Sequence, residues 1–384
     1  MFNFTTLSPL TLYIHIPWCI RKCPYCDFNS HEAKDTLQES QYVAALIADL
    51  EQDLPHIWGR RIESIFIGGG TPSLFSPEAY DNLFSQLRSL LQINPNAEIT
   101  LEANPGTFES QKFKEYRALG INRLSIGIQS FNDDHLQRLG RIHGRSEAIK
   151  AAETAHEAGF ENFNLDLMFA LPQQSPQQAM DDLNTALSLE PTHLSYYQLT
   201  IEPNTFFHHQ PPRSLPDDDT SASIHQHGLE QLSAAGFQHY EVSAFAKNKR
   251  QCFHNMNYWR FGDYLGIGAG AHGKITNAPQ QCVTRTSKPR HPKDYLDETR
   301  RQATHHQLTP QETAFEFMMN ALRMREGFET PLFSERTGLG INIIEKPLRR
   351  AEELELINWD IQRIQPTEKG WLFLNDLLAL FIDD

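Results

Sequence analysis

The stretch LYIHIPWCIRKCPYC, residues 12–26, decides how the rest of the chain is interpreted. It opens with an apolar, partly β-branched run over residues 12–16, which is typical of a buried strand. Cys19, Cys23 and Cys26 follow, so three of the five cysteines of the chain lie within eight residues. Such clustering is wrong for a disulfide framework and indicates a metal site in a reducing compartment.

The spacing of these cysteines favours an iron–sulfur cluster. Thiolates are the usual ligands of such clusters, and a cubane [4Fe–4S] cluster held by three cysteines keeps one iron open for chemistry. A structural zinc site completed by a histidine is the alternative, but zinc modules usually supply two paired C-x2-C half-sites, and the second is missing here. We therefore expect Cys19, Cys23 and Cys26 to hold a [4Fe–4S] cluster.

The chain after this loop alternates apolar runs with stretches of helical period, a pattern that predicts parallel strands joined by crossover helices. We expect six strands, over residues 12–16, 62–67, 98–102, 123–128, 163–168 and 193–199, and helices over 38–54, 77–91, 109–119, 147–158 and 176–189. An open doubly wound sheet and a barrel both accommodate such a run. Polar residues at the ends of successive strands favour a partial (β/α)6 barrel.

The remaining chain predicts a smaller second unit. A loop over 210–220, a helix over 221–235 and a strand over 239–243 complete the core, and the polar, proline-broken stretch 274–306 is typical of a linker or accessory segment. Helices over 313–322 and 344–354, then a hairpin and helix over 361–374, indicate a winged-helix-like α+β module. We expect domains over 1–245, 246–306 and 307–384.

The charge balance excludes a nucleic-acid backbone as the main partner. Lys plus Arg number 34 against 48 Asp plus Glu, a formal net charge of −14, whereas a protein that follows phosphates needs the opposite balance. Residues 301–384 carry 9 basic and 14 acidic side chains, so the winged-helix-like module is expected to pack or to dock a partner rather than to bind DNA. No long apolar run and no signal peptide is evident, so we expect a cytoplasmic protein that is not integral to a membrane.

Glycines and polar residues close successive strands of the expected barrel. The second strand runs into GGGTP, residues 68–72, whose glycines let a ligand approach backbone groups, although a tight turn alone explains such a run equally well. Glu102 ends the third strand, Gln129 ends the fourth, and Asp166 lies within the fifth. Buried polar side chains of this kind bind a ligand or are satisfied by local backbone N–H groups. Their shared position at one edge of the sheet favours a ligand.

The cysteine spacing, after a first strand and before a βα series, resembles the radical S-adenosylmethionine (SAM) superfamily. The resemblance implies a partial (β/α)6 barrel and an open iron that chelates SAM through its amino and carboxylate groups. It also implies that the reduced cluster cleaves the sulfonium to a radical, chemistry that belongs to the cofactor. The GGGTP segment is similar to the element with which that superfamily grips the amino group of SAM.

A closer resemblance, extending from Leu12 into the C-terminal module, is to the oxygen-independent coproporphyrinogen oxidase family. The matching segments are YIHIP (13–17), the cysteine loop, GGGTP (68–72), EANP (102–105), SIGIQS (125–130) and GR (140–141). The resemblance implies that the cluster-bound SAM is held by Tyr13, Gly69 and Glu102. It implies a second pocket, which in the oxidase holds another SAM molecule, lined here by Gly70, Thr71, Gln129, Arg141 and Asp166.

Two departures from the oxidase match its HemW branch, the radical-SAM heme chaperones. The oxidase has a fourth cysteine two residues after the third, where this chain has Asp27-Phe28, and it has an N-terminal extension ahead of the first strand. The segment HNMNYW, residues 254–259, resembles the H-N-x-x-Y-W element by which that branch is thought to hold heme. An imidazole is a natural axial ligand, so His254 is expected to bind heme; the alternative is that His254 and Trp259 are packing residues.

These resemblances imply a heme chaperone that binds a [4Fe–4S] cluster, SAM and heme and passes heme to acceptor proteins, membrane-associated respiratory proteins being one class of acceptor. The alternative is an oxygen-independent coproporphyrinogen III oxidase, which would decarboxylate propionate side chains; Phe28 counts against it. A radical-SAM enzyme that modifies RNA or a peptide is a third class, and the acidic charge argues against RNA. Cys252 is left out of the expected site because a buried free cysteine most often packs as a small hydrophobe.

Overall fold

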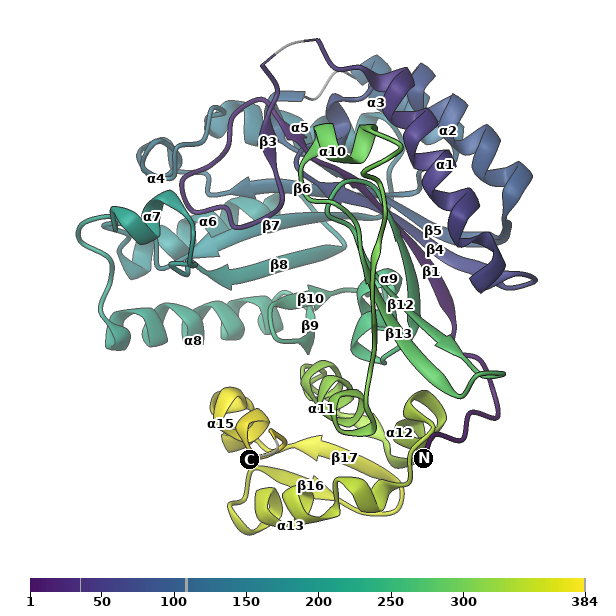
Figure 1. The fold of residues 1–384 in the computed structure, drawn as a ribbon. Helices are drawn as coiled ribbons and strands as arrows, with labels where there is room; N and C mark the ends of the chain where they lie inside the picture. Colours follow the sequence, from purple (N-terminus) through teal and green to yellow (C-terminus); the bar gives the residue numbers. More distant parts are fainter. Residues whose placement is uncertain (35, 108–109, 383–384) are drawn as a thin grey trace.

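A curved sheet forms the centre of the computed structural model, which describes residues 1–34, 36–107 and 110–382 (Figure 1). Among those residues the sheet has twelve strands, in the order β14-β13-β12-β11-β1-β4-β5-β6-β7-β8-β10-β9. Six of them follow in sequence order and pair in parallel: β1 (Leu10–Ile16), β4 (Arg61–Gly69), β5 (Gln92–Ala103), β6 (Arg123–Gln129), β7 (Phe163–Phe169) and β8 (His193–Gln198). These are the six predicted strands, and the predicted α/β partial barrel is confirmed.

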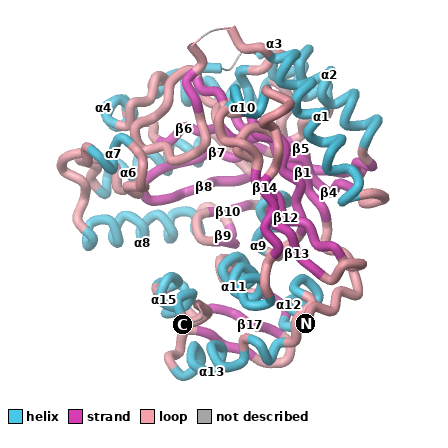
Figure 2. Tube along the Cα trace, viewed as in Figure 1, coloured by secondary structure: helices cyan, strands magenta, loops and turns pink. Residues whose placement is uncertain are grey.

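Crossover helices cover the outer face of this sheet, as the cyan tubes of Figure 2 show. Residue 109, where the third predicted helix begins, lies outside the described residues. The helix over 221–235 begins at Asp218 instead, because the Asp217 side chain accepts a hydrogen bond from the Thr220 N–H and caps it. The helices are α1 (Glu39–Ile57), α2 (Pro77–Leu90), α3 (Ser110–Leu119), α5 (Arg145–Glu157), α6 (Pro176–Ser188) and α8 (Asp218–Ala234).

The two faces of the parallel strands differ in character. On β6, the side chains of Leu124, Ile126 and Ile128 belong to the apolar core beneath the helices. The residues between them, Ser125, Gly127 and Gln129, line the opposite, concave face. This period of two follows from the pleat of a strand, and it leaves the concave face free for polar chemistry.

The stretch 274–306, expected as a linker or accessory segment, extends the main sheet. β11 (Asp263–Ile267) pairs with β1 in parallel, and β12 (His272–Asn277), β13 (Cys282–Ser287) and β14 (Thr304–Gln307) continue in antiparallel order. Its polar side chains are satisfied internally: Lys274 Nζ lies 2.8 Å from Asp263 Oδ1, and Lys288 Nζ lies 2.5 Å from Asp49 Oδ1. Paired buried charges of this kind make a strand look like a loop in the sequence. The predicted strand over 239–243 covers most of β9 (Gln238–Glu241), at the opposite edge, and the turn that leads into β10 (Ala244–Ala246).

A smaller unit below the main sheet forms the C-terminal part (Figure 1). The predicted helices over 313–322 and 344–354 correspond to α11 (Pro310–Ala321) and α13 (Glu345–Glu353). A three-stranded sheet and a second apolar core, which includes Phe317, Phe328 and Phe333, complete the unit. Its other elements are β15 (Phe328–Glu329), α12 (Thr330–Thr337), β16 (Ile357–Trp359), β17 (Arg363–Pro366), α14 (Glu368–Leu372) and α15 (Leu374–Ala379).

The unit packs on the main sheet through helix α9 (Phe253–Trp259), since Met256 and Trp259 contact the second core and α9 contacts α11. The predicted domain bounds themselves stay a prediction. None of the described helices is both long and apolar enough to cross a lipid bilayer. The remaining short elements are β2 (Trp18–Cys19), β3 (His31–Glu32), α4 (Asp133–Arg138), α7 (Phe206–His209), α10 (Pro292–Leu296) and the 3-10 turns at Pro72–Leu74, Pro105–Thr107 and Ile341–Ile343.

Candidate functional site

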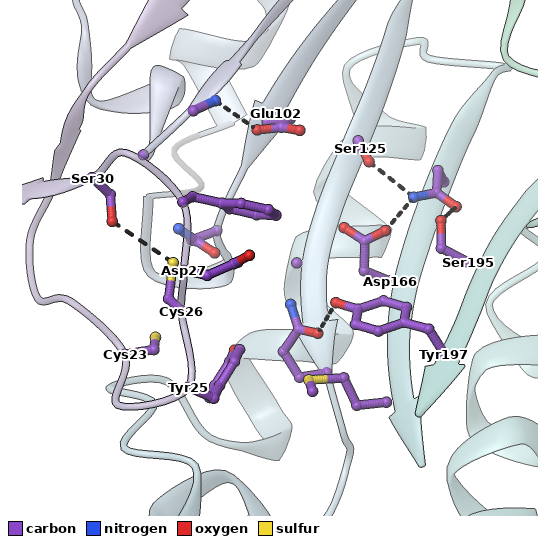
Figure 3. Close-up of a pocket in the computed structure, with 18 of the residues that line it drawn as sticks. Cys23, Tyr25, Cys26, Asp27, Ser30, Glu102, Ser125, Asp166, Ser195 and Tyr197 are labelled. Atoms are coloured by element: carbon purple, nitrogen blue, oxygen red, sulfur yellow. Dashed lines mark hydrogen bonds between the residues drawn. The ribbon is translucent and has the colours of Figure 1, made fainter. Parts of the chain in front are cut away.

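One cavity of about 370 Å³ lies between the cysteine loop and the concave face of the sheet (Figure 3). Its volume falls within the range of sites for small molecules, about 300–1,000 Å³. It brings together nine of the predicted site residues, which come from the cysteine loop, from the strands β4 to β7 and their ends, and from the loop before α5: Cys19, Cys23, Cys26, Gly69, Gly70, Glu102, Gln129, Arg141 and Asp166. Parallel strands direct their carboxyl ends to one edge, which explains why residues far apart in sequence meet there.

The cysteine loop is held in place by the protein itself. Strands β2 and β3 pair Trp18 with His31 and Cys19 with Glu32 across its base. The Lys22 ammonium donates hydrogen bonds to the carbonyl oxygens of Phe28 (3.2 Å) and Ser30 (3.1 Å), which closes the loop. The three thiols are therefore positioned without any bound group.

The thiols have surroundings that suit thiolate ligands. Arg141 Nη1 donates to Cys23 Sγ at 3.5 Å, and the Ser30 hydroxyl lies 3.7 Å from Cys26 Sγ. Burial raises the pKa of the Cys19 and Cys26 thiols, so a metal or a cation is needed to hold them as thiolates at neutral pH. In the described residues no three His, Cys, Asp or Glu side chains converge on one point. A single zinc ion needs such convergence, because Zn–S bonds are about 2.3 Å long, whereas cysteines that bind different irons of one cluster are spread apart.

Gly69 and Glu102 meet at the top of the cavity. The Gly69 N–H donates to Glu102 Oε2 at 3.0 Å. Burial, and then the neighbouring Asp166, raises the pKa of the Glu102 carboxyl to about 8. Gly69 has φ +119°, and a Cβ there would lie 2.6 Å from the His15 ring, so this position requires glycine for packing alone. The glycine run is thus explained without a ligand, whereas Glu102, with a single hydrogen bond to the described residues, has capacity to spare.

The other predicted strand-end residues already have protein partners. Tyr197 donates its hydroxyl proton to Gln129 Oε1 at 2.7 Å, and Asn164 Nδ2 donates to Asp166 Oδ1 at 2.7 Å (Figure 3). Arg141 Nη2 donates to Asn104 Oδ1 at 2.7 Å and to the Gly127 carbonyl. The Arg141 guanidinium is therefore tied to the cysteine loop and to β6, in addition to lining the cavity.

Sequence reasoning missed a polar network on the concave face. The Asn164 amide donates to Ser125 Oγ at 2.9 Å, and its carbonyl oxygen accepts from Ser195 Oγ at 3.1 Å (Figure 3). His193 Nδ1 lies 2.7 Å from the same oxygen. The pairing register places these residues side by side on β6, β7 and β8. Polar residues at alternate positions of three consecutive strands were the available signal.

Two predicted residues lie near the cavity without lining it. The Tyr13 hydroxyl is 2.9 Å from His15 Nδ1, beside the glycine run. Thr71 Oγ1 accepts from Asn104 Nδ2 at 2.7 Å and lines a separate, smaller hollow next to Cys23. Tyr13 is hydrogen-bonded to His15 and Thr71 to Asn104, and Asn104 lines the main cavity.

His254 lies on α9, away from the cavity. It is 1% exposed, and both ring nitrogens have partners: Ser64 Oγ at 3.1 Å from Nδ1, and the Tyr258 hydroxyl at 2.8 Å from Nε2. Burial, and then the charge of Arg123, lowers the pKa of the imidazole to about 3, so the ring is neutral. The next residue, Asn255, does line the cavity. Binding of iron through His254 therefore requires the ring to give up one of these two hydrogen bonds.

Comparisons with known proteins agree with this geometry. The family model of the radical SAM superfamily matches residues 13–186, and that of the HemN C-terminal domain matches residues 308–373. Proteins named heme chaperone HemW are similar over 98% of this chain and 99% of their own length: that of Haemophilus influenzae is 50% identical and that of Escherichia coli 49%. The solved structure of Escherichia coli coproporphyrinogen III oxidase (HemN), a radical SAM enzyme, matches with a TM-score of 0.83 at 25% identity, over 98% of this chain and 90% of that one.

Proposed function

The chain belongs to the radical SAM superfamily and, within it, to the HemW family of heme chaperones, and from this premise we propose that it binds heme and delivers it to acceptor proteins. The observation that carries the proposal is the cavity, which gathers three thiols and the polar ends of neighbouring strands in one place. A site of this composition suits a metal cluster together with an elongated polar ligand.

Cys19, Cys23 and Cys26 would hold a [4Fe–4S] cluster, because all three line one cavity and thiolate is the donor type that such a cluster takes. Arg141 and Ser30 would stabilise the thiolates by hydrogen bonds to sulfur. When bound, the cluster supplies single electrons beside the sulfonium of SAM. The loop around it, closed by Lys22, limits the access of water to the sulfur atoms.

SAM would lie along the strand ends. We assign its amino group to Glu102, which has spare acceptor capacity, with Gly69 and Tyr13 completing that end. Gly70, Thr71, Gln129, Arg141 and Asp166 would hold a second ligand, as the family resemblance implies. The ionised Glu102 carboxylate is the form that pairs with an ammonium group, and such a partner would lower its pKa from about 8.

Heme would be cargo, and we assign His254 as its ligand. The ring is neutral, which is the form that binds iron, and Nε2 would exchange the Tyr258 hydroxyl for the metal. In this assignment α9 both packs the C-terminal unit against the core and presents the heme ligand.

We place this activity in the cytoplasm, where thiols stay reduced. The acceptors would be heme proteins, including membrane-associated respiratory ones. We propose three units, a core over 1–245, its extension over 246–306 and a module over 307–384 that offers a docking surface to acceptors.

An anaerobic heme titration of the cluster-reconstituted protein, read by the Soret band, tests the proposal beside an assay for conversion of coproporphyrinogen III with SAM and a reductant. We expect stoichiometric heme binding and no conversion. The structural likeness to HemN makes the oxidase the second candidate. Conversion that depends on Cys19, without tight heme binding, would establish the oxidase and refute the chaperone.

A further inference from the structure

Arg123 is a buried cation that makes no hydrogen bond with the described residues, and its ion pair with Glu98 is long. It is the first residue of β6, is 2% exposed and lines the cavity. Within the described ranges its guanidinium makes no hydrogen bond, and its Nε is buried without a partner. The nearest carboxylate oxygen, Glu98 Oε2, is 4.0 Å from Nε, beyond hydrogen-bond distance.

Glu98 does not serve as a dedicated counter-ion for Arg123. Its Oε1 accepts from the backbone N–H of Phe253 at 2.9 Å and of His254 at 3.4 Å, and from the Cys252 thiol at 3.6 Å. The carboxylate thus caps the beginning of α9. Its negative charge is already shared by three donors.

Other buried cations of the described chain are paired closely. Arg60 Nη1 lies 2.9 Å from Asp263, Lys274 Nζ 2.8 Å from the same residue, and Lys288 Nζ 2.5 Å from Asp49. An unpaired buried charge is costly, so native proteins rarely keep one without a use. Arg123 differs from these cations in facing the cavity.

The place of Arg123 along β6 determines which part of a bound ligand it can contact. Gln129, which also lines the cavity, is the last residue of the same strand, so Arg123 lies about 20 Å from it at the usual rise of a strand. Asn255 lines the same cavity, and its side-chain amide makes no hydrogen bond with described residues. On the neighbouring strands Glu102 pairs with Ser125 and Asp166 with Gly127, so both carboxyls lie between the levels of Arg123 and Gln129. The other cation described above in the cavity, Arg141, already donates to Cys23, Asn104 and the Gly127 carbonyl, so the uncommitted N–H groups of Arg123 are the ones left to attract an anionic ligand group.

The geometry points to a carboxylate subsite: Arg123, assisted by the Asn255 amide, binds the carboxylate of the ligand that occupies the deep end of the cavity. The planar guanidinium presents two parallel N–H groups, which match the two oxygens of a carboxylate. This inference rests on the proposed function, which supplies two sources of that group. One is the amino-acid part of a SAM molecule, and the other is a propionate of the tetrapyrrole.

Arg123→Met tests the subsite, with Arg60→Met as the matched loss of a buried arginine outside the cavity. For the reconstituted protein we would measure binding of SAM by equilibrium dialysis, binding of heme by titration, and unfolding in urea. Arg123→Met should weaken one ligand at least about tenfold, the usual cost of a lost hydrogen bond to a charged group. Its urea midpoint should stay at the wild-type value, because the side chain has no protein hydrogen bond to lose. Arg60→Met should lower the midpoint and leave both affinities unchanged.

Ligands without the carboxylate identify its source. With a SAM carboxylate at Arg123, decarboxylated SAM binds wild type and Arg123→Met equally, and heme binding is unaffected by the variant. If a propionate lies at Arg123, heme dimethyl ester binds wild type and Arg123→Met equally, and SAM binding is unaffected by the variant. Asn255→Ala, at a half-buried and unpaired position, should weaken the same ligand about threefold and provides the test if Arg123→Met does not fold.

Affinities of Arg123→Met, or of Asn255→Ala in its place, within twofold of wild type for both SAM and heme would overturn the subsite. Failure of the proposed function is a separate result. It would be seen as a wild-type protein that binds no heme, and the SAM arm would still decide the role of Arg123.

Discussion

The cysteine loop, residues 19–26, and helix α9, residues 253–259, both carry a motif that predicts a ligand site, yet the structure treats them differently. The thiols of the loop line a cavity, and their contacts with described residues are few and long. The His254 ring on α9 is buried, and both its nitrogens are engaged by protein partners. The loop is thus ready to bind a metal, whereas α9 has to exchange a hydrogen bond first. The two regions differ because the thiols have hydrogen-bonding and ligand capacity left, whereas both nitrogens of the His254 ring are already engaged.

Replacing a cysteine of the loop should have the largest effect. Loss of an outer partner of a metal ligand already costs about 10- to 100-fold in affinity, so Cys23→Ala, which removes a ligand itself, should abolish the cluster. Iron analysis and the visible absorption of the reconstituted protein measure this. The urea midpoint of the metal-free protein should not change, because Cys23 contributes little packing. Cys282→Ala, on β13 and away from the loop, is the control and should retain full iron. If Cys23→Ala kept the iron content of wild type, Cys23 would not be a cluster ligand, and the contrast between the cysteine loop and α9 would be lost.

His254→Ala should show the opposite pattern, with retained iron and lost stability. The substitution removes two hydrogen bonds and leaves a cavity beside Phe66 and Tyr13, whose rings lie 5.2 and 6.3 Å from the imidazole. We expect the free energy of unfolding to fall by about 2–4 kcal/mol. Urea unfolding measures it, and heme titration of the same protein should show weaker binding.

Tyr258→Phe separates packing from ligation at His254, because it frees Nε2 while the ring stays in place. Heme affinity should be kept or increased in this variant. Heme binding that His254→Ala leaves unchanged would make α9 a packing element alone.

The pH dependence of SAM binding should report on Glu102 at the loop end of the cavity. Its pKa is about 8, so the carboxyl is mostly protonated at pH 6 and mostly ionised at pH 9. Because the ionised form pairs with the SAM amino group, affinity should increase with pH, by at most about tenfold per unit below pH 8. Equilibrium dialysis between pH 6 and 9 measures the slope. Glu102→Gln should bind weakly with no such slope; a wild-type affinity that falls as pH rises would contradict the assignment.

The smallest expected effect is on the reduction potential of the cluster. Arg141 donates a hydrogen bond to Cys23 Sγ and carries a positive charge, both of which favour the reduced cluster. Arg141→Gln should therefore lower the potential, and Arg141→Lys, which keeps the charge, should restore part of the loss. A redox titration followed by electron paramagnetic resonance measures it. Arg138→Gln is the control, because Arg138 donates to the Pro172 carbonyl and, in the described part of the chain, makes no hydrogen bond to a cysteine sulfur.

Much of the fold could be predicted because apolar strands and crossover helices leave a strong pattern in the sequence. The ends of the strands lie together as predicted. Parallel pairing places Gly69, Glu102 and Gln129 at one edge of the sheet, independently of the conformation of the loops. The strands after residue 270 were missed because their charges are paired inside the protein, as Lys274 is with Asp263, and pairing cannot be seen in the sequence.

The concave-face residues were missed for a related reason. A polar residue within a strand, such as Asn164, looks like a weak strand former until its neighbours on the adjoining strands are known. Arg123 is the extreme case, because its importance rests on the absence of a hydrogen-bond partner among the described residues. His254 is the opposite case, because both nitrogens of its ring have protein partners, and the sequence motif does not reveal whether a ring nitrogen is available to a ligand.

Transfer of heme to an acceptor distinguishes a heme chaperone from a coproporphyrinogen oxidase. The reconstituted, heme-loaded protein would be mixed under anaerobic conditions with the apo form of a membrane-associated respiratory heme protein, and the Soret spectrum of the acceptor followed. The account predicts that the acceptor gains heme faster than from a heme-loaded Cys23→Ala protein and that no coproporphyrinogen III is consumed. Heme that stays on the donor, together with Cys19-dependent conversion of coproporphyrinogen III, would contradict it.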